Sequence, residues 1–233
     1  MIKSYPIKTN IFYNIAPDIA VIILAAGTSR RMGCPKLLLP WHGQPLVAHV
    51  LNTVYTTGLH PIMLTYNPHD PASSALIALV VTTVPPNRIN PHLIPVPNVA
   101  AGQAASLAAA LAALPHNTSG ALVLLGDMPQ VTAHTIHRIL AAFAAAQHAF
   151  VVPYYQGHRG NPVLIPAVWF PQIQTLTGDT GASPFLNHPY TPITKLCLNS
   201  PTILADIDTP TDYATLLDTN IAISPTHPLT VLA

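Results

Sequence analysis

The stretch that most constrains the fold of this chain is residues 21–36, VIILAAGTSRRMGCPK. It begins with four consecutive apolar residues, three of them β-branched, and such a run is typical of a strand that is buried on both faces of a sheet. It then changes to small residues and to three cations, Arg30, Arg31 and Lys36, from a chain with only nine lysines and arginines. Because exposed backbone amides and nearby cations both stabilise anions, the pattern predicts a strand that ends in a loop for an anion such as a triphosphate.

Neither of the two common nucleotide-binding motifs fits this loop. A dinucleotide-binding fingerprint has the pattern G-x-G-x-x-G, and the loop has no such glycine pair. A P-loop has the pattern G-x-x-x-x-G-K-[ST], but Gly27 and Gly33 are one residue too far apart and Cys34 stands where the lysine should be. On spacing alone, a solvated basic loop without a ligand remains an alternative.

The composition narrows the class of protein. With 233 residues, the chain can bury one full core, and we place one domain at residues 19–217, between an N-terminal extension (1–18) and a C-terminal tail (218–233). Only 7% of the residues are charged and the net charge is +1, so we expect no nucleic-acid partner. No stretch approaches the roughly 18 to 20 apolar residues of a membrane span. We therefore expect no membrane association and a cytoplasmic location, where Cys34 and Cys197 stay reduced.

Strand-like and helix-like segments alternate along the chain. Apolar runs predict strands at 21–24, 61–66, 92–97, 121–125, 150–153, 193–198 and 203–205, and helical spacing predicts helices at 44–58, 69–80, 101–114, 132–146 and from residue 210. The prolines in 92–97 indicate a strand near an edge or a bend. This alternation predicts a three-layer α/β fold, with a mostly parallel mixed sheet and helices on both of its faces.

Two aspartate motifs are candidate metal ligands. Asp127 follows the apolar run 121–125, and open α/β sheets place their chemistry at the carboxyl ends of buried strands. A carboxylate there suits Mg²⁺, although an Asx-turn or a cap for the helix at 132–146 is equally compatible with the sequence. Asp206 and Asp208 lie two apart on an expected strand, so their side chains point the same way and can share a cation. Thr209 followed by Pro210 predicts a helix start.

The motifs together resemble one family. Residues 24–36 match the pattern L-A-A-G-x-S-x-R-M-G-x-P-K of the molybdenum cofactor cytidylyltransferases, which are MobA-like NTP transferases of the MocA type. Further matches follow in the family's order, from G-x-x-x-S-L at 102–107 and G-D-M-P at 126–129 to G-x-R-G-x-P-V-L at 157–164, L-x-G-D-x-G-A at 176–182 and D-I-D-T-P-x-D-Y at 206–213. The resemblance spans about residues 20–217 and implies a Rossmann-like nucleotidyltransferase fold.

The resemblance also implies a nucleotide site. The family's loop wraps the triphosphate, with an arginine and a lysine on phosphate oxygens, and the helix start at 102 lies near the base or ribose. Plain helix capping is an equal alternative for that helix start, where the family's serines are replaced by Ala104 and Ala105. The nucleotide-binding residues implied are Leu24, Ala25, Ala26, Gly27, Ser29, Arg31, Lys36, Gly102, Ser106 and Asp127.

The remaining motifs imply the metal and the acceptor side. By resemblance, Asp127 and Asp206 hold Mg²⁺ and Asp208 supports them. The resemblance also places Arg159, Asn161 and Asp179 near the acceptor. At position 161 the family more often has histidine. A structural ion pair between Arg159 and an aspartate is an alternative, and so is Asp179 as the cap of a short helix that reaches residue 187.

The function implied is Mg²⁺-dependent transfer of a cytidylyl group from CTP to the phosphate of molybdopterin, with Arg31, Lys36 and Asp127 as the catalytic residues. Phosphoryl transfer of this kind requires positioning and charge neutralisation more than a protein nucleophile. Ala26 favours CTP, because guanylyl relatives usually have glycine there. The alternatives are a related nucleotidyltransferase that uses GTP or another phosphorylated acceptor, and a non-catalytic chaperone that delivers the cofactor to a molybdenum hydroxylase apoenzyme.

Overall fold

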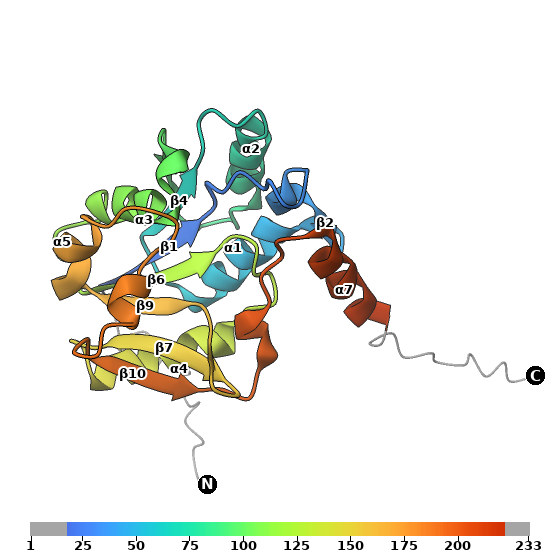
Figure 1. Cartoon of the computed structure of the whole chain (residues 1–233). Coiled ribbons are helices and arrows are strands. Elements are labelled where there is room, and N and C mark those ends of the chain that lie inside the picture. The colour runs from blue at the N-terminus through green and yellow to red at the C-terminus, as the bar shows by residue number, and fades with distance from the viewer. Residues whose placement is uncertain (1–17, 222–233) are drawn as a thin grey trace, which may run out of the picture.

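The fold is built on one eight-stranded sheet, in a computed structural model that describes residues 18–221 (Figure 1). The strand order is β10-β7-β9-β6-β1-β4-β5, and β8 pairs with β7. β1 is parallel to β4 and β6, whereas β9 is antiparallel to β6 and β7. The strands are β1 (Ile19–Leu24), β4 (Ile62–Tyr66), β5 (His92–Pro95), β6 (Gly120–Leu125), β7 (Phe150–Tyr155), β8 (His158–Arg159), β9 (Val163–Pro166) and β10 (Ile193–Cys197). The predicted mostly parallel mixed sheet is confirmed, with β5 at its edge.

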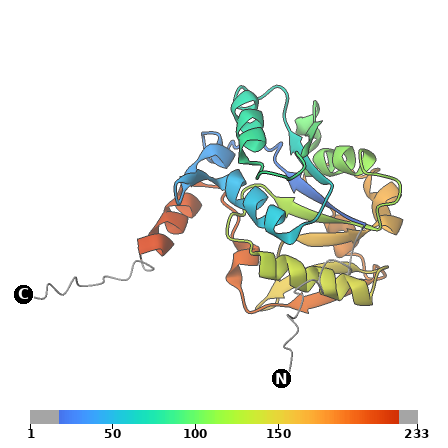
Figure 2. The same cartoon turned by 180° about the vertical axis from the view of Figure 1, so that it is seen from behind.

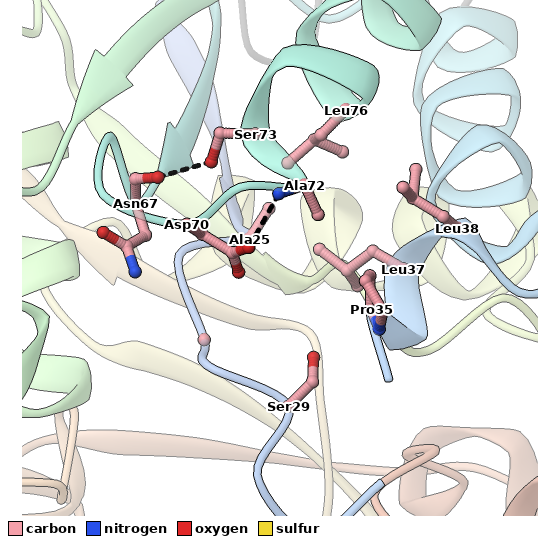
Figure 3. A pocket seen from close by; sticks show the side chains of 11 residues that line it. Ala25, Ser29, Pro35, Leu37, Leu38, Asn67, Asp70, Ala72, Ser73 and Leu76 are labelled. Carbon is pink, nitrogen blue, oxygen red and sulfur yellow. Dashed lines mark hydrogen bonds between the residues drawn. The ribbon is translucent and has the colours of Figure 1, made fainter. Parts of the chain in front are cut away.

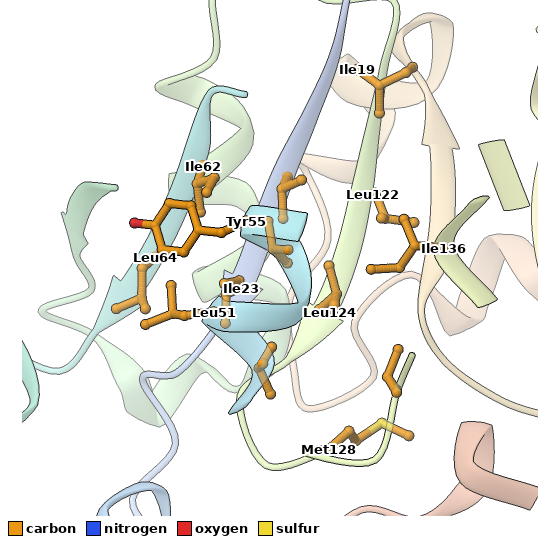
Figure 4. Packing of buried hydrophobic residues seen from close by; sticks show 14 of the residues in the cluster. Ile19, Ile23, Leu51, Tyr55, Ile62, Leu64, Leu122, Leu124, Met128 and Ile136 are labelled. Carbon is orange, nitrogen blue, oxygen red and sulfur yellow. The ribbon is translucent and has the colours of Figure 1, made fainter. Parts of the chain in front are cut away.

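Helices cover both faces of this sheet. Buried side chains of α1, α2 and α4 form one core cluster with the sheet (Figure 4), and those of α3 and α5 belong to a second cluster on the opposite face. Figure 2 shows α1 and α4 in front of the sheet, whereas α7 projects away from it in both views. The helices are α1 (Leu46–Thr57), α2 (Ser73–Thr83), α3 (Gln103–Ala112), α4 (Ala133–Ala145), α5 (Phe170–Ile173), α6 (Ser183–Leu186) and α7 (Pro210–Ile221).

The carboxyl ends of the central strands meet at one edge of the sheet. Leu24 pairs with Leu125 at the ends of β1 and β6, and Ile23 pairs with Leu64 near the end of β4. The segments that follow these strands are therefore neighbours, although they are far apart in the sequence. This is the edge at which parallel α/β sheets bind ligands.

The prediction of a strand at 203–205 was wrong. Residues Pro201–Leu204 form a 3₁₀ helix instead, and Asp206 and Asp208 lie in the irregular segment that follows it. Pro201 lacks the N–H group that a strand needs, and the carbonyl of Ile203 accepts a hydrogen bond from the Asn161 N–H at 2.8 Å rather than from a ladder partner. The two aspartates therefore do not share a strand face.

A small hairpin, β2 (Pro40–Trp41) with β3 (Gln44–Pro45), was not predicted. Its two-residue turn has φ of 46° at His42 and 76° at Gly43, which is typical of tight hairpins. Trp41 of this hairpin packs against a third apolar cluster, which attaches α7 to the loop after β1. The buried members of this cluster are Met32, Leu46, Ile207 and Leu216.

The expected start of the domain at residue 19 coincides with the first residue of β1, whereas its expected end at residue 217 lies inside α7. α7 continues to Ile221, past residue 217, where we placed the domain end. Most of the expected extension and tail lies outside the described residues. These parts are residues 1–17 and residues 222–233. Between residues 18 and 221, no helix has both the length and the apolar character to cross a membrane.

Candidate active site

The loop that follows β1 is fixed at its start by Thr65 on β4. The Ala25 N–H donates a hydrogen bond to Thr65 Oγ1 at 3.0 Å, and the Thr65 side chain is fully buried. Ala25 and Ala26 are also buried, whereas Gly27 and the residue after it are exposed. The loop therefore leaves the sheet as a buried segment and turns outward at Gly27. Thr65 is a positioning residue that the sequence motifs did not indicate.

Ser29 folds the rest of the loop on itself. It has a φ of 50°, and its carbonyl accepts hydrogen bonds from the Met32 and Gly33 N–H groups, each at 3.1 Å. Its hydroxyl accepts a longer one, 3.4 Å, from the Lys36 N–H. These contacts close the loop between Ser29 and Lys36, so both the backbone carbonyl and the hydroxyl of Ser29 hold the segment that carries Arg30, Arg31 and Lys36.

Lys36 lies between two carboxylates at the edge of the sheet. Its Nζ donates to Asp127 Oδ2 and, at 2.6 Å, to Asp208 Oδ1. Arg31 Nη2 lies 2.6 Å from the other oxygen of Asp208. The side chains of Lys36 and Asp127 are 12% and 13% exposed, whereas that of Arg31 is 72% exposed. Four predicted site residues therefore form one cluster, which is largely buried on one side and open on the Arg31 side.

Backbone hydrogen bonds bring Asp208 to this cluster. The Ile207 N–H donates to the Asp127 carbonyl at 3.1 Å, which joins the C-terminal motif to the turn after β6. Asp212 Oδ2 then accepts from the N–H groups of Asp208 and Thr209, at 3.1 and 2.7 Å, while Thr209 Oγ1 accepts from the Asp212 N–H at 3.2 Å. This reciprocal pair is a capping box, and it confirms the helix start predicted at Thr209 and Pro210.

The charges in the cluster depend on one another. Burial would by itself lower the pKa of Lys36, but the carboxylates of Asp127 and Asp208 outweigh it, so the pKa of Lys36 lies above its ordinary value. Burial raises the pKa of Asp127, the Lys36 ammonium offsets part of that rise, and the charges of Asp206 and Asp208 add to it. An additional cation beside Asp127 would relieve this excess of negative charge.

The residues present fit a magnesium ion. Asp127 Oδ1 is buried and has no hydrogen-bond partner among the described residues, which leaves a hard oxygen ligand unused. Asp127 is not a helix cap, because α4 is capped by the Thr132 side chain, which accepts from the Thr135 N–H. Within residues 18–221 no three histidine, cysteine, aspartate or glutamate side chains gather into a metal cage. Magnesium is commonly held by one or two carboxylates with water and phosphate oxygens, so such a cage is not required.

Arg159 is held by neutral partners. Its Nη1 donates to Asn187 Oδ1 at 2.9 Å and its Nη2 to Ser183 Oγ at 3.2 Å. The alternative of an ion pair with an aspartate was therefore wrong. The guanidinium keeps a charge that no carboxylate neutralises among the described residues.

The two residues after Arg159 pack against the C-terminal segment. A Cβ on Gly160 would lie 2.3 Å from the Ile203 carbonyl oxygen, so only glycine permits this approach. The neighbouring Asn161 N–H donates to the same carbonyl. Gly160 and Asn161 thus position the segment that leads to Asp206, whose side chain is exposed, and to Asp208.

Asp179 caps α3 rather than the short helix α6. Its Oδ1 accepts from the Gln103 N–H at 3.1 Å, and α6 has no side-chain cap. The expectation that Asp179 caps the helix reaching Asn187 was wrong, because the 178–179 turn lies against the start of α3. Gly102 has a φ of 82°, and a Cβ there would lie 2.4 Å from the carbonyl carbon of Gly178. Ser106, one turn further on, is buried.

A sequence profile of the MobA-like NTP transferase domain matches residues 21–193, which include the loop after β1, Asp127, Arg159 and Asp179. The chain belongs to the MobA-like NTP transferase domain family. This confirms the resemblance indicated by the motifs. Asp206 and Asp208 follow the matched region, so their place beside Asp127 rests on the hydrogen bonds described above.

Relatives of this MobA-like transferase carry different names. Nicotine blue oxidoreductase of Paenarthrobacter nicotinovorans is 28% identical over 177 residues, 73% of this chain and 82% of the relative. Purine catabolism protein PucB of Bacillus subtilis (strain 168) is 29% identical over 201 residues, 85% of this chain and 95% of the relative. The crystal structure of Rv0371c from Mycobacterium tuberculosis H37Rv is 30% identical with a TM-score of 0.74 and covers 86% of this chain and 97% of its own. A further structure of Rv0371c is a complex with manganese, at 27% identity and a TM-score of 0.71.

A pocket lies beside the loop of this MobA-like transferase, on the side of α1 and α2 (Figure 3). It is a shallow, open groove that combines apolar walls with three polar residues after β4. Our motif analysis missed those three, although an N-x-x-D sequence directly after a buried strand was a usable signal. The lining residues are Ala25, Gly27, Ser29, Pro35, Leu37, Leu38, Asn67, Asp70, Ala72, Ser73 and Leu76.

Proposed function

We propose that this protein transfers a cytidylyl group from CTP to the terminal phosphate of molybdopterin. In this reaction an oxygen of the acceptor phosphate forms a bond to the α-phosphorus of CTP, and the bond from that phosphorus to the β-phosphate oxygen breaks. The products are molybdopterin cytosine dinucleotide and pyrophosphate. The observation that carries the proposal is the cluster of Lys36, Arg31, Asp127 and Asp208 at the strand ends of a MobA-like NTP transferase domain.

The loop after β1 would bind the triphosphate. The exposed backbone at Gly27 offers N–H donors, and Arg31 and Lys36 would contact the β- and γ-phosphates. Arg31 is mostly exposed and contacts only Asp208 within the cluster, so its guanidinium can turn to a phosphate with little cost in packing. Lys36 would neutralise the negative charge that collects on the leaving pyrophosphate.

Asp127 would hold Mg²⁺ through its unpartnered Oδ1. Asp208 is the better supported second ligand, because it and Asp127 both contact the Lys36 ammonium. The exposed Asp206, which the family resemblance names as the second ligand, is the alternative. The ion, when bound, stabilises negative charge on the α-phosphate during the attack. The related Rv0371c has been crystallised as a complex with manganese, which is also a divalent ion.

Arg159 would bind the acceptor phosphate. Its partners Asn187 and Ser183 are neutral, so the positive charge remains available to an anion. Asn161 lies on the same turn, and Asp179 supports the start of α3 through the Gln103 N–H. Asn161 does not titrate near neutrality, so we propose no acid or base role for it.

A pyrophosphate-release assay tests this function. The protein is given molybdopterin as acceptor, Mg²⁺, and CTP or GTP in parallel, and we expect release with CTP. A preference for GTP would contradict the cytidylyl assignment. Tight binding of the finished dinucleotide without pyrophosphate release would instead favour a chaperone that serves a molybdenum hydroxylase.

An Asp127→Ala variant provides the control for the metal site. We expect it to lose turnover by a factor on the order of a hundred or more while keeping its far-UV circular dichroism spectrum. Full turnover by this variant would show that the metal is held elsewhere.

A further inference from the structure

β1 and β4 pair in parallel, and their ladder of hydrogen bonds ends in a side-chain contact. The Val21 N–H donates to the Pro61 carbonyl at 2.9 Å. Alternate residues of a strand face the same neighbour, so four positions further along both strands the Ala25 N–H would meet the Thr65 carbonyl. It bonds instead to the Thr65 hydroxyl oxygen, Oγ1, at 3.0 Å. The chain therefore leaves the ladder at Ala25, where a side chain takes the place of a ladder carbonyl.

The peptide group between Leu24 and Ala25 is held from both neighbouring strands. On the β4 side its N–H donates to Thr65, and on the β6 side its carbonyl accepts from the Gly126 N–H at 3.0 Å. Figure 1 shows β1 between β4 and β6. Two hydrogen bonds in opposite directions fix the plane of this peptide group, and with it the direction in which the chain continues. Gly126 directly precedes Asp127, so the same peptide group ties the loop to the turn of the candidate metal ligand.

The Thr65 hydroxyl is the buried partner on which this arrangement depends. Thr65 is 0% exposed, the lowest value among the buried polar residues that the structure describes. The hydroxyl also donates a longer hydrogen bond, of 3.4 Å, to the Ile23 carbonyl, so it is used both as a donor and as an acceptor. Without the hydroxyl the buried Ala25 N–H would lose its partner, and an unsatisfied buried donor is costly. We therefore expect the start of the loop to shift when the hydroxyl is removed.

Two exposed N–H groups follow soon after this peptide group. Ala26 is still buried, whereas Gly27 and Thr28 are exposed. The N–H groups of Gly27 and Thr28 donate no hydrogen bond to the part of the chain that the structure describes, and a Cβ on Gly27 would meet nothing within 4 Å. Successive N–H groups of this kind form a typical binding surface for phosphate oxygens. Their direction depends on the fixed peptide group before them.

We propose that Thr65 is a positioning residue for the triphosphate of the nucleotide. It makes no contact with the ligand, and its hydroxyl holds the peptide group before Ala25 so that the N–H groups of Gly27 and Thr28 face the phosphates. This inference rests on the proposed function, which supplies the triphosphate on the loop. It predicts that the hydroxyl of Thr65 matters more for binding than the volume of its side chain.

The test separates the two parts of the Thr65 side chain. Thr65→Val keeps the shape and removes the hydroxyl, whereas Thr65→Ser keeps the hydroxyl and removes the methyl group. Calorimetry with the full chain and Mg²⁺ measures the binding of CTP and of inorganic triphosphate, which has neither base nor ribose. We expect Thr65→Val to bind both ligands more weakly, on the order of tenfold, and Thr65→Ser to stay within about threefold of the unmodified protein.

Thr135→Val is the matched control. Thr135 is also a buried threonine, 3% exposed, but it belongs to α4, and its hydroxyl lies 3.2 Å from the Thr132 hydroxyl. We expect this variant to lose some thermal stability together with that hydrogen bond, but to bind both ligands as the unmodified protein does. A loss of affinity in Thr65→Val alone is then not a consequence of lower stability.

Hydrogen exchange of single amides, measured by NMR without any ligand, reports on the loop itself. In Thr65→Val the Ala25 amide should exchange faster, because its buried acceptor is gone, while the amides of residues 20–23 in β1 keep their rates. Faster exchange along the whole of β1 would assign the effect to a general loss of the sheet and would overturn the positioning role.

The outcomes also separate this inference from the proposed function. Unchanged affinity of Thr65→Val for both ligands would overturn the inference and leave the cytidylyl transfer standing, and so would a larger loss in Thr65→Ser than in Thr65→Val. A loss with CTP alone would overturn it as well, since the affected contact would then be to the base or the ribose. Hydroxyl-dependent binding of inorganic triphosphate without pyrophosphate release from CTP would support the inference and contradict the proposed function. No binding of either ligand by the unmodified protein would overturn both.

Discussion

Lys36 Nζ and Asp208 Oδ1 lie 2.6 Å apart, although 172 positions separate the two residues in the sequence. The same ammonium group contacts Asp127, so one cation bridges the two carboxylates that we propose as metal ligands. Lys36 thus has two possible sets of partners, the carboxylates and the phosphates of a nucleotide. Its contacts with the carboxylates must weaken when a metal and a triphosphate bind together.

The first prediction concerns competition between Lys36 and the metal. Lys36→Met removes the ammonium group but keeps much of the apolar side chain, so Asp127 loses its cationic partner and Asp208 keeps only Arg31. We expect the affinity for Mn²⁺, measured by electron paramagnetic resonance without nucleotide, to rise on the order of tenfold, because a competing positive charge is absent. Unchanged Mn²⁺ affinity would show that the metal does not share ligands with Lys36.

The second prediction separates the two C-terminal aspartates. Asp208→Asn breaks the contacts to Lys36 and Arg31, whereas the exposed Asp206 makes no ion pair in the described part of the chain. We expect Asp208→Asn to lower kcat/KM for pyrophosphate release by on the order of a hundredfold, and Asp206→Asn by about tenfold or less. A larger loss in Asp206→Asn would restore Asp206 as the second ligand.

The third prediction concerns the start of α3. Gly102→Ala would place a Cβ 2.4 Å from the backbone of Gly178, at a φ of 82°. We expect the free energy of unfolding to fall by more than about 2 kcal/mol, because strain and a backbone clash act together. Gly157 has a similar φ of 83° but open space around it, so Gly157→Ala should cost only about 1 kcal/mol. Urea denaturation of both variants measures the difference, and equal losses would mean that the 178–179 turn moves away freely.

The fourth prediction concerns pH and α7. Hydrogen bonds from the Thr209 hydroxyl, and then from the Thr209 and Asp208 N–H groups, hold the pKa of Asp212 below its ordinary value. A lowered carboxyl pKa stabilises the fold above the unfolded-state pKa of about 3.9, and this stabilisation is lost as the pH falls through the lower folded-state value. We expect Asp212→Asn to melt about 2 °C lower at neutral pH. This gap should close in acid, and a gap that persists there would assign the effect to packing instead.

The fold was largely predictable because its signals are local. β1 and β6 are continuous apolar runs, which identify them as buried strands. Thr209 followed by Pro210 is a helix start signal, so the start of α7 is also recognisable without tertiary information. The segment at 203–205 has the apolar composition of a strand, but its conformation is decided by the Asn161 N–H more than 40 residues earlier, which no local pattern reveals. The hairpin at 40–45 is too short for a periodic signal.

The candidate site was predictable in its residue types but not in its pairings. The motifs pointed to Arg31, Lys36, Asp127 and Asp208 separately, and only the packed strand ends show that one ammonium group joins two of the carboxylates. Asp179 has the sequence context of a cap for the helix that follows it, yet it caps α3, because the choice between two nearby N–H groups depends on how the 178–179 turn packs. Thr65 lies outside the family motifs, and its contact with the Ala25 N–H becomes visible only in three dimensions.

The hydrogen bond from Ile207 to the Asp127 carbonyl also bears on how the protein matures. A ribosome delivers β1, β4 and β6 long before it delivers residues 206–208, so the central parallel strands can pair while the cluster still lacks its closing carboxylate. During that interval Lys36 has Asp127 as its sole carboxylate partner from the cluster, and the loop after β1 is without the contact that links Arg31 to Asp208. If the cluster binds a nucleotide and a metal as we propose, this capacity is acquired in one of the last steps of synthesis, when the segment leading into α7 docks.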